Sequence, residues 1–348
     1  MTEYLSRMIG PRYNLYTPFY YSNRMKSPRV FMKKAFILVF NVLFITICLN
    51  IAYDKLIVGE KTVRYAVVRS FPLRTYSRIQ GWMCQIYLPW PINIAVLKVF
   101  CNTLGITLQD AERENLSEYS SVNDLFTRKL KASARKIEEG LVSPVDGTVV
   151  CCDDARASLR YPIKGVNYRI EDLLGDEDVW SKIGKDSMLK HIVIYLAPHN
   201  YHRIHSFTEF VVRDVMHIPS LLFSIGKKSM EYFPGLLAKN ERVVFSGEYE
   251  YGYCGMVAVG SVGVGSISTT IANIKTNRVS GPFSKTKKEF SGRKLYKKGE
   301  EIGHFNLGST VVMVFEWPKS FPDYKIEGSV QMGQTLMLEP LKDEQFWS

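Results

Sequence analysis

The residues best placed to do chemistry lie at a glycine–serine step near the C-terminus, Gly308-Ser309, which leads directly into the apolar run 311–315. If this peptide bond is held in a strained turn, the Ser309 hydroxyl can attack the Gly308 carbonyl and move the acyl group from nitrogen to oxygen. Glycine allows the turn and leaves that carbonyl unhindered. The backbone would then carry an ester. A Gly-Ser-Thr step is common on its own, and its ordinary role is in a β-turn.

A serine hydroxyl needs a base, and histidine is the side chain that serves near neutral pH. Three of the six histidines, including His202 and His205, lie in the segment 198–205, directly after the apolar strand 191–196. If a helical turn begins at Asn200, the two histidines share one face and can line one site. A surface histidine pair is the alternative. A metal site is not predicted, because no His-Glu-x-x-His pattern or cysteine pair at ligand spacing occurs.

An acidic residue stands in a Pro/Gly turn, in Ser-Pro-Val-Asp-Gly-Thr at 143–148. The ordinary role of such an aspartate is to bond its own backbone. The functional alternative is that Asp146 accepts a hydrogen bond from one ring nitrogen of His205. It would then fix the tautomer and support the imidazolium that forms when Ser309 loses its proton.

The composition is that of a globular protein, with 46% hydrophobic and 23% charged residues among 348. The formal net charge of +11 is concentrated in residues 1–34, which carry seven basic side chains and one acidic one. A basic leader before an apolar run indicates targeting or attraction to a membrane surface, so no nucleic-acid partner is predicted. The six cysteines lack a C-x-x-C pattern and are expected to be buried and unpaired.

A transmembrane helix is predicted over residues 35–53, which carry no charge and match a bilayer core of ~30 Å. A buried core helix is the alternative. The leader 1–34 has the composition of a mitochondrial presequence, and a disordered cytosolic tail is its alternative. We therefore expect a single-pass protein of the mitochondrial inner membrane whose following domain faces the intermembrane space. The endoplasmic reticulum is the alternative location.

The remaining chain divides at about residue 135. Residues 54–135 are expected to be helical and membrane-associated, because arginines accompany Trp82, Tyr87 and Trp90. Packing of these helices on their own domain is the alternative. Residues 136–348 carry short β-branched runs between Gly, Pro and Asn, at 141–152, 191–198, 241–252, 255–270 and 309–318. The predicted fold class is α+β, a β-rich catalytic domain with peripheral N-terminal helices after a single transmembrane helix.

Taken together, these segments resemble the mitochondrial-type phosphatidylserine decarboxylase family from about residue 126 to the C-terminus. The matching motifs, in order, are F-T-R-K-L (126–130), S-P-V-D-G-T (143–148), Y-H-R-I-H (201–205), N-E-R-V (240–243), M-V-A-V-G with V-G-S-I (256–267), K-G-E-E-I-G-H-F (298–305) and L-G-S-T (307–310). The resemblance implies a β-rich fold and a membrane-bound precursor that cleaves itself between Gly308 and Ser309. The products would be chains 1–308 and 309–348, associated as a heterodimer, with any higher oligomer left open.

The resemblance also implies roles for single residues. Ser309 would become the pyruvoyl cofactor, with Asp146 and His205 as its partners in self-processing. The amine of phosphatidylserine, presented by a membrane, would form a Schiff base with the pyruvoyl ketone and lose CO2. His202 would return a proton, and hydrolysis would release phosphatidylethanolamine.

Some positions depart from the family pattern. Ser220 and Gly226 stand where glycine and asparagine are expected, and His199 and His304 are expected to be solvated loop side chains. Two other functions remain open at this point. The first is an uncleaved serine hydrolase using Ser309, His205 and Asp146, although no G-x-S-x-G elbow surrounds the serine. The second is a non-enzymatic lipid-binding homologue.

Overall fold

The computed structural model describes residues 72–155, 169–225, 235–263, 266–271, 274, 276–277, 287–306 and 309–339. The predicted leader 1–34 and the predicted transmembrane helix 35–53 lie outside these residues, and both stay predictions. Within the described ranges, every helix is too short or too polar to cross a bilayer.

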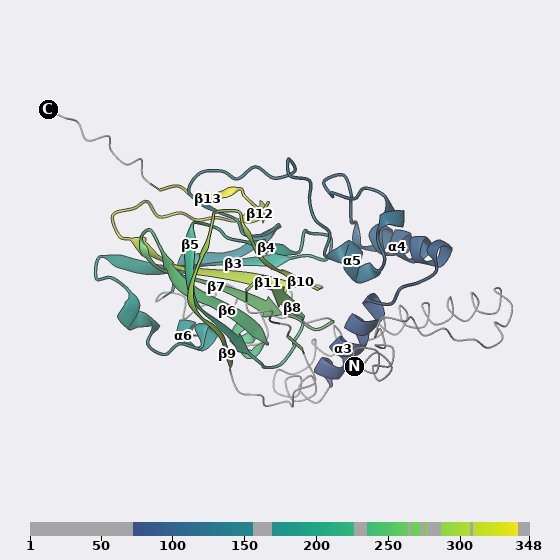
Figure 1. The fold of residues 1–348 in the computed structure, drawn as a ribbon. Coiled ribbons are helices and arrows are strands. Elements are labelled where there is room, and N and C mark those ends of the chain that lie inside the picture. Colours follow the sequence, from purple (N-terminus) through teal and green to yellow (C-terminus); the bar gives the residue numbers. More distant parts are fainter. Residues whose placement is uncertain are drawn as a thin grey trace, which may run out of the picture. The chain divides into compact units, whose positions relative to one another are not determined.

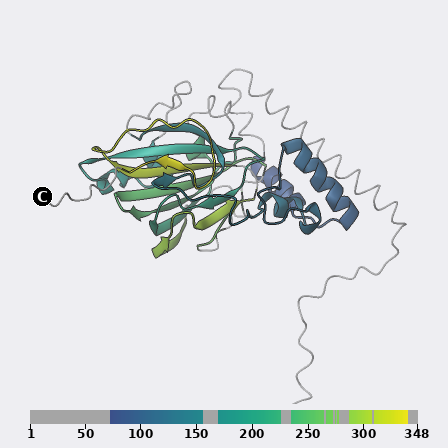
Figure 2. The ribbon, with the colours of Figure 1, turned by 90° about the horizontal axis from the view of Figure 1, so that it is seen from above.

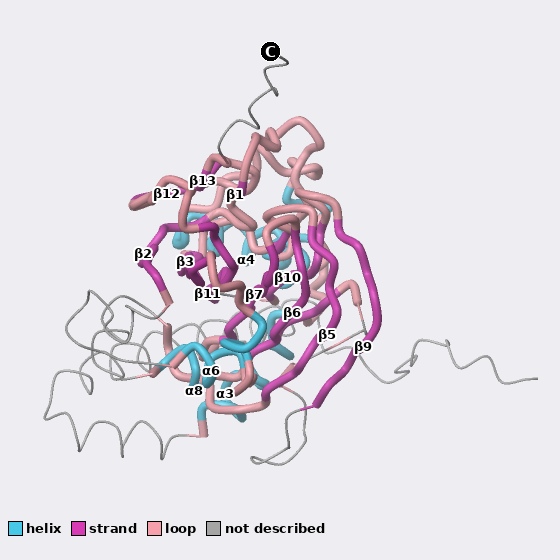
Figure 3. Tube along the Cα trace, turned by 90° about the vertical axis from the view of Figure 1, so that its left-hand side faces the viewer, coloured by secondary structure: helices cyan, strands magenta, loops and turns pink. Residues whose placement is uncertain are grey.

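An eight-stranded antiparallel sheet forms the main part of the fold (Figure 1). Figure 3 shows the strands of this sheet side by side, from β2 on one side to β9 on the other. β11 lies inside the sheet, paired over its length with β3 and over most of it with β7. In spatial order the strands are β12 (Gly328–Val330), β2 (Gly147–Asp154), β3 (Ser187–Leu196), β11 (Ser309–Pro318), β7 (Gly252–Gly260), β6 (Arg242–Tyr249), β5 (Phe210–Ile218) and β9 (Lys287–Tyr296).

Two smaller sheets accompany the large one. The first contains β4 (Arg203–His205), β10 (Glu301–Phe305) and β8 (Ile267–Thr269), with β10 in the middle. The second pairs β1 (Leu141–Val142) with β13 (Thr335–Met337). The main hydrophobic core joins side chains of all three sheets, including Ile204 of β4, Phe305 of β10 and Met313 of β11. Burial of these side chains therefore holds the small sheets against the large one.

Short helices flank the sheets. They are α3 (Leu73–Cys84), α4 (Trp90–Leu104), η1 (Leu116–Glu118), α5 (Val122–Phe126), α6 (Ile170–Leu174), η3 (Val179–Lys182) and α8 (Leu236–Lys239). Two prolines lie at the break between α3 and α4. Pro89 caps the start of α4 and Pro91 lies in its first turn, where a missing N–H costs nothing. Gly105 ends α4 with φ 73°, a left-handed conformation that glycine adopts easily. Figure 2 shows α4 beside the sheets rather than across them.

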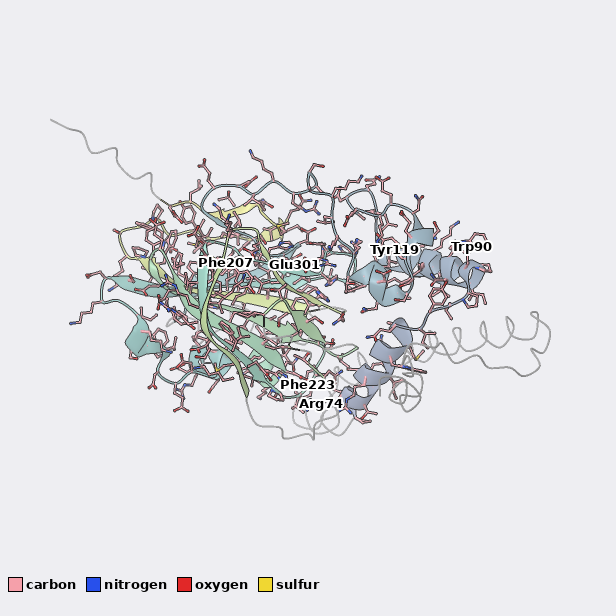
Figure 4. All side chains as sticks on the ribbon, viewed as in Figure 1. Arg74, Trp90, Tyr119, Phe207, Phe223 and Glu301 are labelled. Atoms are coloured by element: carbon pink, nitrogen blue, oxygen red, sulfur yellow. The ribbon has the colours of Figure 1, made fainter. Side chains whose placement is uncertain are left out.

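Helix α3 is attached to the β-rich domain by polar contacts. The Arg74 guanidinium lies 3.4 Å from the buried carboxylate of Glu241, and the Ser77 hydroxyl accepts a hydrogen bond from the Gly263 amide at 3.0 Å. Figure 4 shows Arg74 on this helix near Phe223 of the domain. Ile79 and Trp82 of the same helix stay exposed to solvent. Helix α3 therefore has one docked face and one free apolar face.

The β-rich α+β class is confirmed, and the predicted strand runs all contain strands. Runs 141–152 and 255–270 each hold two strands rather than one. Two long strands, β5 and β9, lie outside the predicted runs. β9, Lys-Lys-Glu-Phe-Ser-Gly-Arg-Lys-Leu-Tyr, is an edge strand, and edge strands can be highly charged. The short strands β4, β10, β12 and β13 also lie outside the predicted runs, because they form through pairing with distant segments and carry little local signal.

A substitution at Gly303 tests how closely β10 and β8 pack in the three-stranded sheet. A Cβ at this position would lie 2.4 Å from the backbone oxygen of Ser268, so β10 and β8 would have to separate. Gly303→Ala should lower the free energy of unfolding by about 1–3 kcal/mol. Gly292→Ala on β9 is the matched control and should cost less, because its Cβ would meet only the Phe290 ring at 3.1 Å. Thermal unfolding of the purified chains measures both, and equal midpoints would contradict this account of β10.

Candidate active site

The predicted reactive serine lies where three neighbouring strands of the large sheet begin or end side by side. β3 ends at Leu196, β7 ends at Gly260 and β11 begins at Ser309, whose backbone is in register with both. β10 ends at Phe305, only a few residues before Ser309 in the chain. The strand ends therefore bring Y-H-R-I-H, which follows β3, and Ser309, the first residue of β11, to one end of the sheet.

The histidine segment forms a turn followed by a strand. After β3, the Asn200 side chain accepts a hydrogen bond from the Ala197 amide at 2.7 Å, and the Asn200 amide donates to the Ala197 carbonyl at 2.9 Å. β4 then begins at Arg203 and pairs with β10. The helical turn expected from Asn200 is therefore wrong, because pairing with a strand about 100 residues later decides the backbone conformation.

His202 lies in a sealed, apolar environment. Its side chain is completely buried, and its ring stacks on Phe126 of α5 with the centroids 4.0 Å apart. Neither ring nitrogen has a hydrogen-bond partner of acceptable geometry among the described residues. Burial lowers the pKa of His202 to about 3, and the nearby Arg128 charge adds to this effect, against a smaller opposing effect of the Pro198 and Ala197 carbonyls. The ring is therefore neutral at physiological pH.

His205 has both ring nitrogens occupied. Nδ1 lies 2.8 Å from the Gly299 carbonyl oxygen, which can only accept, so Nδ1 carries the hydrogen. The neutral ring then has its lone pair on Nε2, where it accepts a hydrogen bond from the Tyr201 hydroxyl at 2.9 Å. Burial lowers the pKa of His205, and the Gly299 carbonyl partly offsets this by favouring the protonated ring. The fixed tautomer makes Nε2 the basic nitrogen.

Asp146 forms an ion pair instead of the expected bond to His205. Arg135 holds its two carboxylate oxygens in a fork, at 2.6 Å and 3.2 Å, and the Met332 amide donates to the carboxylate at 2.8 Å. A planar guanidinium bound at two points is a stronger partner for a carboxylate than a neutral imidazole. The predicted Asp146–His205 hydrogen bond is therefore wrong for this structure. The two segments are still neighbours, since the His205 amide donates to the Pro144 carbonyl at 2.9 Å.

Two arginines, one outside the histidine segment and one within it, tie this segment to its neighbours. Arg128 donates to the carbonyls of His199 at 3.1 Å and Asn200 at 3.4 Å. Arg203 donates to the Thr127 carbonyl at 2.9 Å and forms an ion pair with Glu301. Segments F-T-R-K-L, Y-H-R-I-H and K-G-E-E-I-G-H-F are thus tied together by side chains to which the sequence reading gave no role.

Motif N-E-R-V holds the strand ends beside Ser309. The Asn240 amide donates to the carbonyls of Phe223 at 2.8 Å and Gly260 at 2.9 Å, and Gly260 is the β7 residue opposite Ser309. Arg242 donates to the backbone carbonyls of Leu173, Ala238, Asn240 and Asp172. No role was predicted for this motif from the sequence. Its polar residues are buried among apolar strands, which a linear pattern does not reveal.

Of the other positions named in the sequence analysis, one matches its expected surroundings and one does not. His199 is exposed, as expected. His304 is not a solvated loop residue, because it lies half-buried on β10 with Nδ1 3.9 Å from Glu301, and burial lowers its pKa. Ser220 donates its hydroxyl to the Lys239 carbonyl at 2.7 Å. Gly226 and Gly308 lie outside the described residues, and of Ser309 only the backbone is described.

Comparison with known proteins supports one family. The model of the phosphatidylserine decarboxylase family matches residues 122–338. The mitochondrial phosphatidylserine decarboxylase proenzyme of Cricetulus griseus is 33% identical over 285 residues, which cover 74% of this chain and 69% of that protein. The proenzyme of Pseudoalteromonas atlantica is 35% identical over 252 residues, covering 70% and 86%. That of Coxiella burnetii is 33% identical over 276 residues, covering 76% and 94%.

The buried neutral His202 predicts a pH dependence of stability. The unfolded chain binds a proton at this side chain below about pH 6.5, whereas the folded chain does so only near pH 3. Between these values the unfolded state binds more protons, so the free energy of unfolding falls as pH falls. His202→Phe should reduce this fall, whereas His199→Gln, an exposed control, should not. Urea unfolding at pH 7 and pH 4.5 measures it, and equal pH slopes for His202→Phe and the unmodified chain would refute the assignment.

Proposed function

The chain belongs to the phosphatidylserine decarboxylase family, and on this premise we propose that it cleaves itself between Gly308 and Ser309 and then converts phosphatidylserine to phosphatidylethanolamine and CO2. The observation that carries the proposal is the register at the end of the large sheet. Ser309 starts β11 where β3 and β7 end, and the histidine segment follows β3 at that level. The Phe305 amide, four residues before Ser309, donates to the His202 carbonyl at 2.9 Å, which supports placing the buried His202 near the proposed bond.

In the first step, a base takes the Ser309 hydroxyl proton while the oxygen attacks the Gly308 carbonyl carbon. The carbon–nitrogen bond breaks, the freed amine takes up the proton, and an ester remains. We assign the base to Nε2 of His205, the nitrogen that the Gly299 contact leaves unprotonated. The Tyr201 hydroxyl, which now donates to Nε2, must turn aside or relay the proton. Asp146 supports the imidazolium through its nearby negative charge.

In the second step, Ser309 loses its Cα proton and its Cβ–O bond, so that the Gly308 carboxylate leaves. Hydrolysis of the resulting dehydroalanine releases ammonia and leaves a pyruvoyl group on chain 309–348. The surroundings fit such a group, because both nitrogens of the buried His202 lack a partner among the described residues. When present, the group supplies a ketone that condenses with the substrate amine and draws the electrons of the breaking carbon–carboxylate bond.

His202 holds and moves the proton of the decarboxylation. Its low pKa keeps the ring neutral before substrate arrives. A substrate carboxylate next to the ring favours the protonated form, because an opposite charge in a site of low dielectric raises the pKa of an imidazole. After CO2 leaves, His202 donates this proton to the carbon. The Phe126 ring, stacked on the imidazole, limits the access of water to it.

We also propose that α3 and the start of α4 contact the membrane that carries the substrate. Trp82, Tyr87 and Trp90 are 67%, 72% and 68% exposed, an unusual state for three large aromatic side chains in neighbouring segments. Figure 4 shows Trp90 on α4, away from the labelled residues of the β-rich domain. Aromatic rings of this kind suit the headgroup region of a bilayer.

The proposed location is the mitochondrial inner membrane, with the β-rich domain facing the intermembrane space. The basic leader 1–34, the apolar segment 35–53 and the mitochondrial relatives support it. Bacterial relatives show that the family also occurs outside mitochondria. Membership of the phosphatidylserine decarboxylase family counts against both the serine hydrolase and the non-enzymatic homologue. An uncleaved chain that is trapped as an acyl-enzyme would favour the first, and an uncleaved inert chain would favour the second.

The two histidines should separate maturation from turnover. His205→Ala should leave an uncut chain, because the base for the Ser309 hydroxyl is lost. His202→Ala should mature into two chains but lose decarboxylase activity by about 10²-fold or more, since general acid catalysis contributes ~10²–10⁴-fold. Gel analysis and CO2 release measure the two properties, with Ser309→Ala as the uncut, inactive control. The reverse pattern would mean that the two assignments are exchanged.

The aromatic surface can be tested on vesicles. Replacing Trp82 and Trp90 together by alanine should weaken binding to vesicles of phosphatidylserine and phosphatidylcholine at least fivefold, because two exposed rings of the proposed contact are lost. Phe321→Ala is the matched aromatic control, since Phe321 packs against Trp317 on the β-rich domain. Co-sedimentation measures the bound fraction. Unchanged binding of the double variant would exclude this surface as the contact.

A further inference from the structure

The chain passes from one sheet to another just before the proposed cleavage point. Phe305 is the last residue of β10 in the three-stranded sheet, and Ser309 is the first residue of β11 in the eight-stranded sheet. The backbone of Ser309 is fixed by its register with Leu196 and Gly260. The other end of this connection is Asn306, whose contacts decide how firmly the chain is held before the cleaved bond.

Asn306 is held mainly by strand β8 and by the residue that immediately precedes that strand. Its backbone amide donates to the Ser266 carbonyl at 2.9 Å. Its side-chain amide donates to the Ser268 hydroxyl at 3.1 Å and the Ser266 hydroxyl at 3.2 Å, with a longer contact of 3.3 Å to the Ser266 carbonyl. An asparagine in a turn usually bonds its own neighbouring backbone. Here the bonds instead reach a segment about 40 residues away.

The oxygen of the same side chain faces helix α5. Asn123 of this helix donates its side-chain amide to the Asn306 oxygen at 3.4 Å. One turn later, Phe126 of the same helix stacks on His202. Asn306 thus connects β8, α5 and the start of the reactive segment.

We infer that Asn306 is a positioning residue for the self-cleavage proposed above, and that it acts by fixing the chain two residues before the Gly308–Ser309 bond. Asn306 and the Ser309 backbone are then both anchored, so the two ends of the reactive segment are held at fixed positions when the hydroxyl attacks the carbonyl. Restriction of this kind lowers the entropy cost of an intramolecular attack. Asn306 itself takes up and gives up no proton.

Two substitutions separate the parts of this role. Asn306→Ala removes all side-chain bonds and keeps the backbone bond to Ser266. Asn306→Asp keeps the size but replaces two N–H donors with a carboxylate oxygen facing the Ser266 carbonyl, so repulsion replaces attraction. Each variant should slow precursor cleavage about tenfold or more, as expected when several well-formed hydrogen bonds are lost from the reactive arrangement.

The experiment follows cleavage of the full-length chain after a pulse of cell-free synthesis, on denaturing gels. Asn102→Ala, which changes an exposed asparagine on α4, is the matched control and should cleave at the unmodified rate. Hydroxylamine shows which step is slowed, because it cuts an ester but not an amide. A thermal unfolding midpoint equal to that of the unmodified precursor separates the loss of positioning from misfolding. Hydroxylamine should speed cleavage of the unmodified chain. It should change the cleavage rate of the Asn306 variants little, because their ester does not form.

Two further outcomes keep the inference separate from the proposed function. If the unmodified chain itself stays whole, the proposed self-cleavage fails. If the unmodified chain is cut and the Asn306 variants are cut at the same rate, only the positioning role fails. Ser268→Ala removes one acceptor without changing Asn306 and serves if the Asn306 variants do not fold. It should slow cleavage by a smaller factor, and an unchanged rate in this variant would count against the inference.

Discussion

The position of β11 inside the large sheet is the constraint on which the proposed chemistry depends. Its first residue, Ser309, is already in register with β3 and β7. The backbone on the C-terminal side of the proposed reactive bond is therefore held in place by strand pairing. Each described strand after this point pairs with strands that precede it: β11 with β3 and β7, β12 with β2, and β13 with β1. A cut before Ser309 would leave all of this pairing in place. The two proposed chains would therefore stay together through backbone hydrogen bonds and the shared core.

The two histidines of one short segment have different surroundings, which is the physical basis for giving them different roles. His202 is stacked on Phe126 without a hydrogen-bond partner among the described residues, and burial keeps its pKa low. His205 is held by a carbonyl on one side and a phenol on the other, so its tautomer is fixed. Separation of environments is a general way in which one site performs two proton transfers.

Much of the fold was predictable from the sequence, because β-branched runs between glycines and prolines mark strands without knowledge of their partners. The break between α3 and α4 was predictable from Pro89 and Pro91. The strand β4 was not, since its conformation comes from pairing with β10. At the site, the motifs identified the segments that meet, but not the partners of single side chains. Arg135 competes for Asp146 from a segment outside every quoted motif, and only the folded chain reveals that competition.

The most direct test of the central claim is an intact-mass measurement on the purified protein. The account predicts two chains that separate only under denaturing conditions, ending at Gly308 and beginning at position 309. The smaller chain should be lighter by one ammonia than residues 309–348 with a free serine amino terminus, because the amine is replaced by a ketone. A single uncut chain, or a smaller chain that keeps its serine amine, would contradict the account.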